Sequence, residues 1–295
     1  MGKLFALTTA LFWALGVVLY KRSFTFVTPF AMSVFKTLVG FVLLAATTVA
    51  VGQTHSGSVS CTHLIVILVS GALGIGISDT LYLMALSRLG ASRTAIVDCL
   101  YSPFVILFSA LLLDETLSRL ALAGGFLILS SVLISSNRGF EKRISPKQLW
   151  EGCALGVGAM GTVGFAIVLV KPLLQTYPLA WLSTVRMAGG LGALVLLLPL
   201  HPDRRAVVAA FRPQPGWPWM LLGTLFGSYL SLMSWLAGFK YAQAGVAALL
   251  NQTSTVFIIL LAALILREPL TRLKLIAISI AFAGAAMVLY SRAAA

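Results

Sequence analysis

The chain has 295 residues, of which 59% are hydrophobic and 10% are charged, and its mean hydropathy is +1.00. A soluble protein of this length could not bury so many apolar side chains in its core, which excludes the soluble fold classes. In a soluble chain the formal net charge of +13 would suggest a nucleic acid or another acidic partner, but the distribution of the cations along this chain has a different explanation.

Apolar segments recur along the whole chain, and each is roughly 17 to 24 residues long. In chain order they lie near residues 4–20, 29–51, 64–87, 94–113, 117–136, 149–170, 178–200, 217–239, 245–266 and 270–290. A helix needs roughly 20 residues to cross about 30 Å of hydrocarbon. The pattern therefore predicts an all-α integral membrane protein with ten transmembrane helices, placed as a multi-pass protein in the cell (inner) membrane.

The second half of the chain repeats the first at an offset of 153 residues. The identities are Gly74, Ser78, Ala110, Leu111, Glu115, Leu117, Arg119, Leu120 and Leu122 with Gly227, Ser231, Ala263, Leu264, Glu268, Leu270, Arg272, Leu273 and Leu275. Each half has five segments, and an odd number of crossings forces the second half to enter the membrane from the opposite face, as in many transporters. We expect a first five-helix repeat over residues 1–137, a linker over 138–148 and a second, inverted repeat over 149–295.

The cations are unevenly distributed between the two sides of the membrane. Loops after the first, third, fifth, seventh and ninth segments carry fourteen of the 21 Lys and Arg residues, whereas the opposite side, with both termini, carries five. Short loops rich in Lys and Arg stay in the cytoplasm, so this bias predicts termini outside and the central linker inside. The basic charge is therefore a signal of topology, and no nucleic-acid partner is expected.

Motifs that carry catalysis or bind cofactors are absent from the sequence. Cys61, Cys99 and Cys153 lack CxxC spacing, and the three histidines lack the spacing of paired metal ligands. The chain also has no GxSxG motif, no P-loop and no glycine-rich turn between a strand and a helix. We expect no enzymatic activity, no metal, no cofactor and no ATP hydrolysis.

Three ionisable residues lie inside predicted helices at one depth. Lys36, Asp79 and Asp98 belong to the second, third and fourth helices, and at 1.5 Å per residue all three lie within roughly 12 Å of one membrane surface. A charge in the bilayer costs about 2.5 to 3.5 kcal/mol even on lenient scales and commonly has a function. We expect Lys36 to pair with an aspartate and the other carboxyl to bind a proton, since two like charges at one site disfavour each other. The alternative is a structural Lys–Asp bridge, with the second aspartate near interfacial water.

The second repeat keeps a cation at the corresponding position but lacks the acid. An offset of 150 pairs Lys36 with Arg186, whereas Asp79 corresponds to Leu232 at the offset of 153. An unpaired guanidinium favours an anion, so Arg186 is a candidate ligand for a solute carboxylate or phosphate. The alternative is that its side chain extends to the lipid headgroups.

The fourth and ninth helices carry features that favour a cavity. Pro103 removes a backbone hydrogen bond inside the fourth helix, and a kink beside Asp98 is typical of helices that line cavities. The ninth helix has five consecutive polar residues, 251–255, in an apolar span. We predict that Asn251 and Gln252 contact the solute, with hydrogen bonds between helices as an alternative that is compatible with this.

Aromatic side chains mark a candidate cavity wall. Trp13, Tyr82 and Trp235 lie deep in their helices, Tyr101 and Trp181 lie in the fourth and seventh helices, and Tyr82 and Trp235 correspond between the repeats. A deep indole or phenol needs a partner for its N–H or O–H, and we expect the side chains of Trp13, Tyr82, Tyr101 and Trp235 to flank an organic solute. The alternative is anchoring at the membrane interface, which is the commoner role of Trp and Tyr near helix ends.

Two five-helix halves, each with a basic residue in its second helix, resemble the EamA-type members of the drug/metabolite transporter superfamily. The junctions between the fourth and fifth helices add to the resemblance, with Asp-Glu-Thr-Leu-Ser over residues 114–118 and Arg-Glu-Pro-Leu-Thr over 267–271. The second junction fits the family's Glu-Pro-Leu pattern, and the first has threonine in place of proline. The resemblance implies both termini in the cytoplasm, opposite to the charge count.

The resemblance also implies a secondary active, exporter-like transporter of a small organic metabolite, with a central cavity and alternating access. Its partners would be the solute and the lipid bilayer, while the depth and pairing of Asp79, Asp98 and Lys36 suggest protons as the coupling ion. A flippase for lipid-linked sugars and a membrane scaffold without transport are the alternatives. We interpret Glu115 and Glu268, which precede the fifth and tenth helices, as helix caps aided by Ser118 and Thr271.

Overall fold

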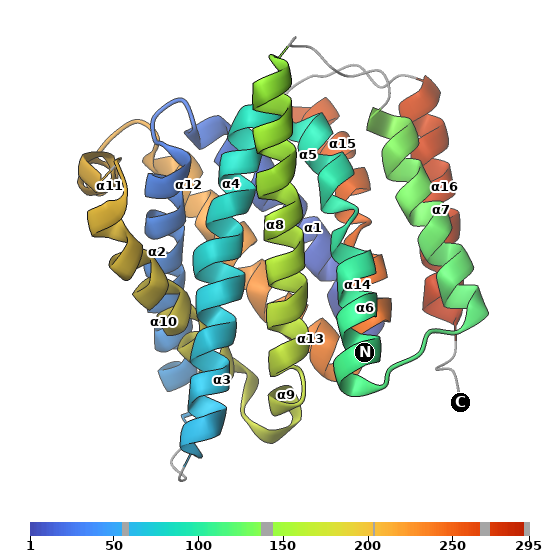
Figure 1. Ribbon diagram of the computed structural model, residues 1–295, viewed down its shortest axis with the longest axis horizontal. Helices are drawn as coiled ribbons and strands as arrows, with labels where there is room; N and C mark the ends of the chain where they lie inside the picture. The colour runs from blue at the N-terminus through green and yellow to red at the C-terminus, as the bar shows by residue number, and fades with distance from the viewer. Residues whose placement is uncertain (55–58, 137–143, 203, 266–271, 292–295) are drawn as a thin grey trace.

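The computed structural model describes residues 1–295 except 55–58, 137–143, 203, 266–271 and 292–295 (Figure 1). The first half contains α1 (Gly2–Ser23), α2 (Pro29–Ala50), α3 (Cys61–Gly71), η1 (Ala72–Ile77), α4 (Ser78–Leu89), α5 (Ala91–Asp98), α6 (Tyr101–Leu113) and α7 (Arg119–Ser136). The second half contains α8 (Pro146–Val170), α9 (Leu173–Thr176), α10 (Leu179–Leu197), η2 (Leu198–Leu200), α11 (Arg204–Ala210), α12 (Trp217–Thr224), η3 (Leu225–Leu230), α13 (Ser231–Tyr241), α14 (Ala244–Asn251), α15 (Ser254–Ile265) and α16 (Arg272–Tyr290). Within the described residues, six spans are long and apolar enough to cross a membrane and four shorter apolar helices accompany them, which confirms the predicted fold class.

Corresponding helices of the two halves make corresponding contacts with the opposite half, as an inverted repeat requires. Helix α4 packs on α8 as α13 packs on α1, and α6 packs on α8 as α15 packs on α1. The contacts of α10 with α3 and η1 are matched by those of α2 with α12 and η3. Each contact joins one half to the other, so the two halves bury their inner faces together. The predicted boundaries at residues 137 and 148 remain a prediction, since 137–143 lie outside the described residues.

The third and eighth spans each contain a π-helical turn at the same place in the repeat. η1 covers Ala72–Ile77 and η3 covers Leu225–Leu230, which coincide at the offset of 153. Directly before η1, Gly71 lies so near α10 that an added Cβ would collide with the carbonyl oxygen of Arg186. Turns of this kind commonly occur at functional sites, and these two precede helices α4 and α13, which carry several of the predicted site residues.

The fourth and ninth spans are broken at equivalent positions. Helix α5 ends at Asp98 and α6 begins at Tyr101, while α14 ends at Asn251 and α15 begins at Ser254. Pro103 lies in the first turn of α6, where a missing N–H removes no helical hydrogen bond. The ninth span has valine at the equivalent position and is broken as well. The predicted bend is therefore present, but proline is not the common cause of the two breaks.

Polar side chains satisfy the backbone groups that the breaks release. The Nε2 of Gln252 donates to the carbonyl of Asp98 at 2.8 Å, and the hydroxyl of Thr253 donates to the carbonyl of Leu250 at 2.7 Å. Freed backbone groups without partners are costly in a membrane, so the polar run of the ninth span stabilises irregular backbone. The hydrogen bond between helices that was the alternative for Gln252 is present.

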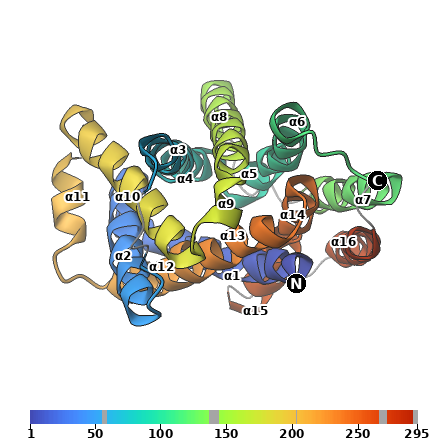
Figure 2. The same cartoon turned by 90° about the horizontal axis from the view of Figure 1, so that it is seen from below.

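Helices α7 and α16 pack against each other at one end of the molecule (Figures 1 and 2). Gly124 and Gly284 face each other, and a Cβ on either would lie 2.6 Å from the carbonyl oxygen of the other. Small residues allow this close approach of two backbones. The pair is thus held by direct backbone contact.

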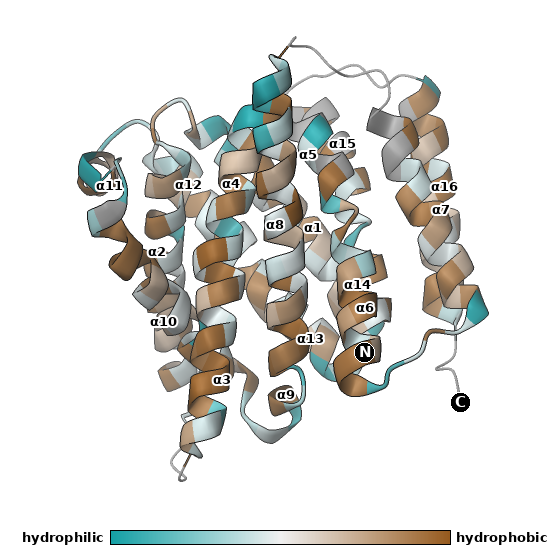
Figure 3. Cartoon of the chain, viewed as in Figure 1, coloured by the Kyte–Doolittle hydropathy of each residue, from teal (hydrophilic) through white to brown (hydrophobic). Residues whose placement is uncertain are grey.

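Hydrophobic residues cover the lengths of outer helices such as α3, α7 and α16, and hydrophilic residues lie mainly near helix ends (Figure 3). Large apolar side chains such as Phe126, Leu196 and Leu264 are exposed on this outer surface. In water such a surface would drive aggregation, whereas lipid tails solvate it.

Glu115 caps a helix, but not the predicted one. Its Oε2 accepts the N–H of Ala244, the first residue of α14, at 2.7 Å, and its Oε1 pairs with Lys171. Ser118 does cap α7, with its Oγ accepting an N–H of the first turn at 3.2 Å. The chain between α6 and α7 therefore brings Glu115 to the second half, which its position in the sequence did not reveal. Glu268 lies outside the described residues.

Candidate functional site

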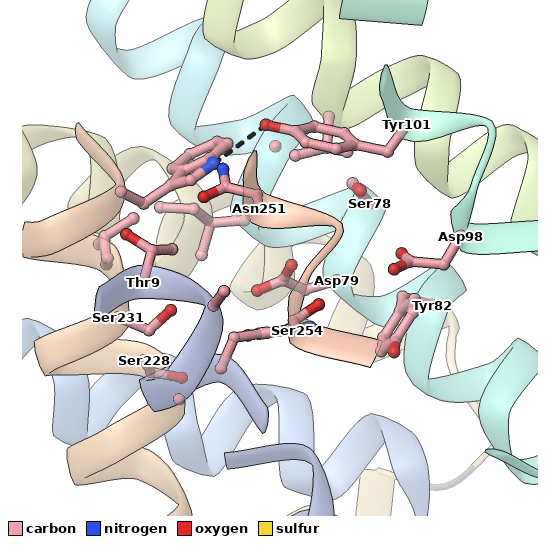
Figure 4. A pocket seen from close by; sticks show the side chains of 18 of the residues that line it. Thr9, Ser78, Asp79, Tyr82, Asp98, Tyr101, Ser228, Ser231, Asn251 and Ser254 are labelled. Atoms are coloured by element: carbon pink, nitrogen blue, oxygen red, sulfur yellow. Dashed lines mark hydrogen bonds between the residues drawn. The ribbon is translucent and has the colours of Figure 1, made fainter. Parts of the chain in front are cut away.

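A cavity of about 140 Å³ lies between the two halves (Figure 4). It is bordered by α1, α2, α4, α8, α10 and α13, by both π-helical turns and by both helix breaks. Nine of the ten predicted site residues line it, namely Trp13, Lys36, Asp79, Tyr82, Asp98, Tyr101, Trp235, Asn251 and Gln252. Arg186 does not line the cavity. The lining residues together come from eight of the ten predicted transmembrane segments.

Lys36 of α2 and Asp79 of α4 form an ion pair on the cavity wall. Both residues line the cavity, but the lysine side chain is 3% exposed and the aspartate side chain 23% exposed, so the carboxylate is the more accessible partner. A buried ammonium needs such a counter-charge, because an uncompensated charge away from water is strongly unfavourable. The predicted pairing is present.

Asp98 stands at the end of α5, directly before the break. Its carboxylate points into the cavity, with the Tyr82 ring beside it (Figure 4). Among the described residues no side chain or backbone N–H donates a hydrogen bond to that carboxylate, whereas its backbone carbonyl accepts from Gln252. Asp98 therefore shares the cavity with the ion pair but is not part of it.

Arg186 of α10 is fully buried inside the protein. Its Nη2 donates to the carbonyl of Ser70 at 3.5 Å, and Nε and Nη1 have no hydrogen-bond partner in the described part of the chain. The Trp235 ring lies 5.4 Å from the guanidinium carbon, within cation–π range, and a Cβ on Gly74 would lie 3.0 Å from Nη2. The interpretation that Arg186 extends to the lipid headgroups is wrong, because the side chain points into the helix bundle and is covered by Trp235.

Trp235 of α13 is held by the other half of the protein. Its indole N–H donates to the Tyr101 hydroxyl at 3.0 Å. The Asn251 amide oxygen lies 3.1 Å from the same N–H when the amide is oriented to donate to the carbonyl of Ala6 at 2.9 Å. One indole N–H is therefore shared between the break of the fourth span and that of the ninth.

The remaining aromatic residues divide between the cavity and the periphery. The rings of Trp13 and Tyr82 are 5.7 Å apart on the cavity wall. Trp181 was also a candidate for the cavity wall, and this is wrong: its ring lies 5.2 Å from the Tyr177 ring near the start of α10, and it does not line the cavity. Depth within the helix, rather than aromatic character alone, separated these two groups.

Hydroxyl groups of the cavity were missed by the sequence argument. Ser78, Ser228, Ser231, Ser254 and Thr9 line it. Ser228 is hydrogen-bonded to the Tyr20 hydroxyl at 2.7 Å, and Ser78 donates to the carbonyl of Ala159 at 2.8 Å. The sequence signal that could have identified two of them is that Ser78 and Ser231 occupy corresponding positions of the repeats.

The model of the EamA-like transporter family matches residues 1–137 and 150–290 of the chain. One of the solved structures that it matches, described as "Crystal structure of protein", has a TM-score of 0.79 and 18% sequence identity, and 98% of each chain is covered. At that identity the likeness is one of fold. No curated protein matches the chain.

Proposed function

Because the chain belongs to the EamA-like transporter family, we propose that it is a secondary active, exporter-like transporter of a small organic metabolite, coupled to protons and working by alternating access across the cell (inner) membrane. The observation that carries the proposal is the Lys36–Asp79 ion pair beside the free Asp98 carboxylate on the wall of one cavity between inverted halves. Charged groups inside a membrane are expensive, and a purely structural role gives no reason for a third, unpaired charge.

Protons bind at the two carboxylates of the cavity. Asp98 has no counter-charge among the described residues, so a proton neutralises it while the cavity faces the more acidic side. Protonation of Asp79 would dissolve its ion pair and release Lys36 to interact with the solute or with Asp98. Proton binding and the arrangement of α2, α4 and α5 are coupled in this way.

The other proposed site residues, Trp13, Tyr82, Tyr101, Trp235, Asn251, Gln252 and Arg186, bind the solute. The aromatic rings supply large rigid surfaces for an organic molecule, and the amides supply directional hydrogen bonds. Arg186 reaches an anionic group of the solute only after the Trp235 ring moves away from the guanidinium. Alternating access then requires the two halves to rock around this site.

The two alternatives have less support. A cavity of about 140 Å³ suits a small soluble metabolite better than the headgroup of a lipid-linked sugar. A scaffold without transport gives no reason for an ion pair, an unpaired carboxylate and two broken helices around one cavity.

Flux measurements in liposomes test the proposal. Amino acids, amines, nucleobases and sugar phosphates are first screened by thermal shift on the purified protein, and the most stabilising compound becomes the flux probe. We expect the wild type to move this probe in response to a pH gradient, as followed with an internal pH-sensitive dye. Asp79→Asn and Asp98→Asn should lose the gradient dependence, whereas Asp114→Asn, a surface change of the same chemistry, should keep it. Full proton-dependent flux in both cavity variants would end the coupling proposal.

A further inference from the structure

The ionisable groups that line the cavity leave one negative charge without a partner. Lys36 and Asp79 neutralise each other, whereas the Asp98 carboxylate accepts no hydrogen bond from a described residue. The nearby cation Arg186 does not line the cavity and lies behind Trp235. Apolar surroundings screen charge weakly, so Arg186 still acts on Asp79, with which it interacts electrostatically. The excess negative charge is therefore local to Asp98, and a positive charge is favoured at that end of the cavity.

Aromatic rings adjoin the unpaired carboxylate. The Tyr82 ring lies beside Asp98 (Figure 4), and the Trp13 ring is 5.7 Å from the Tyr82 ring. The faces of such rings attract a cation within about 6 Å of the ring centre. The Asp98 carboxylate therefore provides an ion-pair partner for an ammonium group, and the Tyr82 ring beside it, with the Trp13 ring next to Tyr82, provides an aromatic surface.

We propose that the transported solute carries a positively charged amine, which binds the Asp98 carboxylate against the rings of Tyr82 and Trp13. This inference rests on the proposed function and narrows its substrate class. It also makes a proton and the amine competitors for one carboxylate, so acidification weakens amine binding. A solute carboxylate is not required, since Arg186 is covered in this state.

Binding of three probes with the same apolar part and different end groups tests the charge requirement. Phenethylamine, 2-phenylethanol and 3-phenylpropanoate share a phenyl ring and a two-carbon chain, and they carry a positive, a neutral and a negative end group. Titration of the purified protein, followed by the fluorescence of its cavity tryptophans and by calorimetry, measures recognition without any gradient. We expect phenethylamine to bind about tenfold or more tightly than the other two. Asp98→Asn should abolish the difference, while Asp114→Asn, at an exposed acid outside the cavity, should preserve it.

The outcomes separate this inference from the proposed function. Equal binding of the three probes, tighter binding of 3-phenylpropanoate, or an amine preference that survives Asp98→Asn overturns the amine assignment. Absence of phenethylamine binding to a folded wild type overturns it as well. Proton-coupled flux of an anionic or neutral metabolite in liposomes would leave the transporter proposal standing while the amine assignment fails.

A second, independent observation concerns the face at which the chain termini lie. Glu115, in the loop of the first half between α6 and α7, uses both carboxylate oxygens to contact the second half. One oxygen pairs with Lys171 after α8, and the other accepts the Ala244 N–H at the start of α14. Beside it, Gln243 donates to the carbonyl of Thr116 at 3.4 Å. We call Glu115, Lys171 and the first N–H of α14 the Glu115 latch.

The two ends of the molecule differ in these contacts. Helix α6 packs on α14 at the terminal face, with the Ser102 hydroxyl donating to the carbonyl of Ala248 at 3.1 Å. The equivalent segments at the other face, α5 and α15, share no comparable packing in the described parts of the chain. Lys21 corresponds to Lys171 at the offset of 150, but the counterpart of Glu115 is Glu268, which lies outside the described residues. The comparison of the two faces therefore rests on the packing of the broken spans, and the latch is described at the terminal face.

We infer that the Glu115 latch keeps the cavity closed at the terminal face and must open before a solute can pass there. Spin labels at exposed Leu112 of α6 and exposed Tyr241 of α13, in a background without native cysteines, report the separation of the halves beside the latch. We expect one short distance in the parent protein and an added longer distance in both Glu115→Ala and Lys171→Gln. Lys240→Gln removes a charge from the same face without touching the latch and should change nothing.

Two latch variants keep the test decisive if one of them folds poorly. Glu115→Gln should give an intermediate result, because its amide oxygen can still accept the Ala244 N–H but no longer pairs with Lys171. Unchanged distance distributions in both Glu115→Ala and Lys171→Gln would overturn the inference. So would the same added distance in Lys240→Gln, because the effect would then follow surface charge rather than the latch.

Discussion

Removing one partner of the Lys36–Asp79 ion pair should destabilise the protein by an amount that depends on which partner remains. Lys36 is 3% exposed and Asp79 is 23% exposed. Asp79→Leu introduces the residue that the second repeat has at this position and leaves a buried ammonium without a counter-charge, which should lower the free energy of unfolding by about 3 to 5 kcal/mol. Lys36→Met leaves a carboxylate that reaches the cavity, so we expect a loss of roughly 1 to 3 kcal/mol.

The double variant Lys36→Met/Asp79→Leu removes both charges and leaves two apolar side chains. Replacing a buried ion pair by apolar residues of similar volume is often close to neutral, so the double variant should exceed Asp79→Leu in stability by at least about 2 kcal/mol. This difference measures the penalty of the isolated ammonium rather than the strength of the pair.

Equilibrium unfolding in mixed micelles with increasing SDS, followed by tryptophan fluorescence, gives the four free energies of the cycle. Asp114→Asn is a suitable control because Asp114 is exposed and has a positive φ of 52°, which asparagine also tolerates. The reasoning from burial is refuted if Lys36→Met destabilises as much as Asp79→Leu, or if the double variant loses the sum of the two single losses.

Three further predictions concern packing and the helix breaks. Gly124→Ala places a Cβ 2.6 Å from a carbonyl oxygen of α16 and should cost about 1 to 3 kcal/mol by the same unfolding assay, whereas Gly192→Ala, with no atom within 4 Å, should be neutral or stabilising by up to about 1 kcal/mol. Trp235→Phe removes the N–H donor to Tyr101 and should lower stability by roughly 1 kcal/mol; no loss in the unfolding titration would contradict the shared hydrogen bond. Pro103→Ala should leave the break of the fourth span in place, because the ninth span is broken without proline; a continuous helix over 91–113 in a structure of the variant would contradict this.

The fold could be predicted from the sequence because lipid imposes a simple rule on it. Apolar runs of membrane length mark the helices, and the repeat of residues such as Glu115 and Glu268 at one offset implies the inverted halves. The grouping of Lys36 with Asp79 was also predictable, since buried opposite charges at one depth have few ways to avoid each other.

Other features depend on contacts between the halves and carry little local signal. The burial of Arg186 behind Trp235 follows from the close approach of α10 to η1, where Gly71 and Gly74 leave room for it. The distance of Arg186 from the helix end suggested that its side chain lies near the membrane surface. That expectation was wrong because this distance does not show which way the side chain points. The hydrogen bond between Glu115 and the first N–H of α14 likewise depends on the path of the loop between α6 and α7, which crosses to the other half.

The breaks divide the fourth and ninth spans unequally, and this has a mechanical consequence. Helices α5 and α14 have eight residues each, about 12 Å of helix, and they lie toward opposite faces of the membrane. A tilt of either short segment about its break would widen the passage on its own side while the longer remainder of that span stayed packed. We expect each face to have a separate hinge of only a few residues, so that solvent could reach the same central side chains from either direction without the whole bundle coming apart.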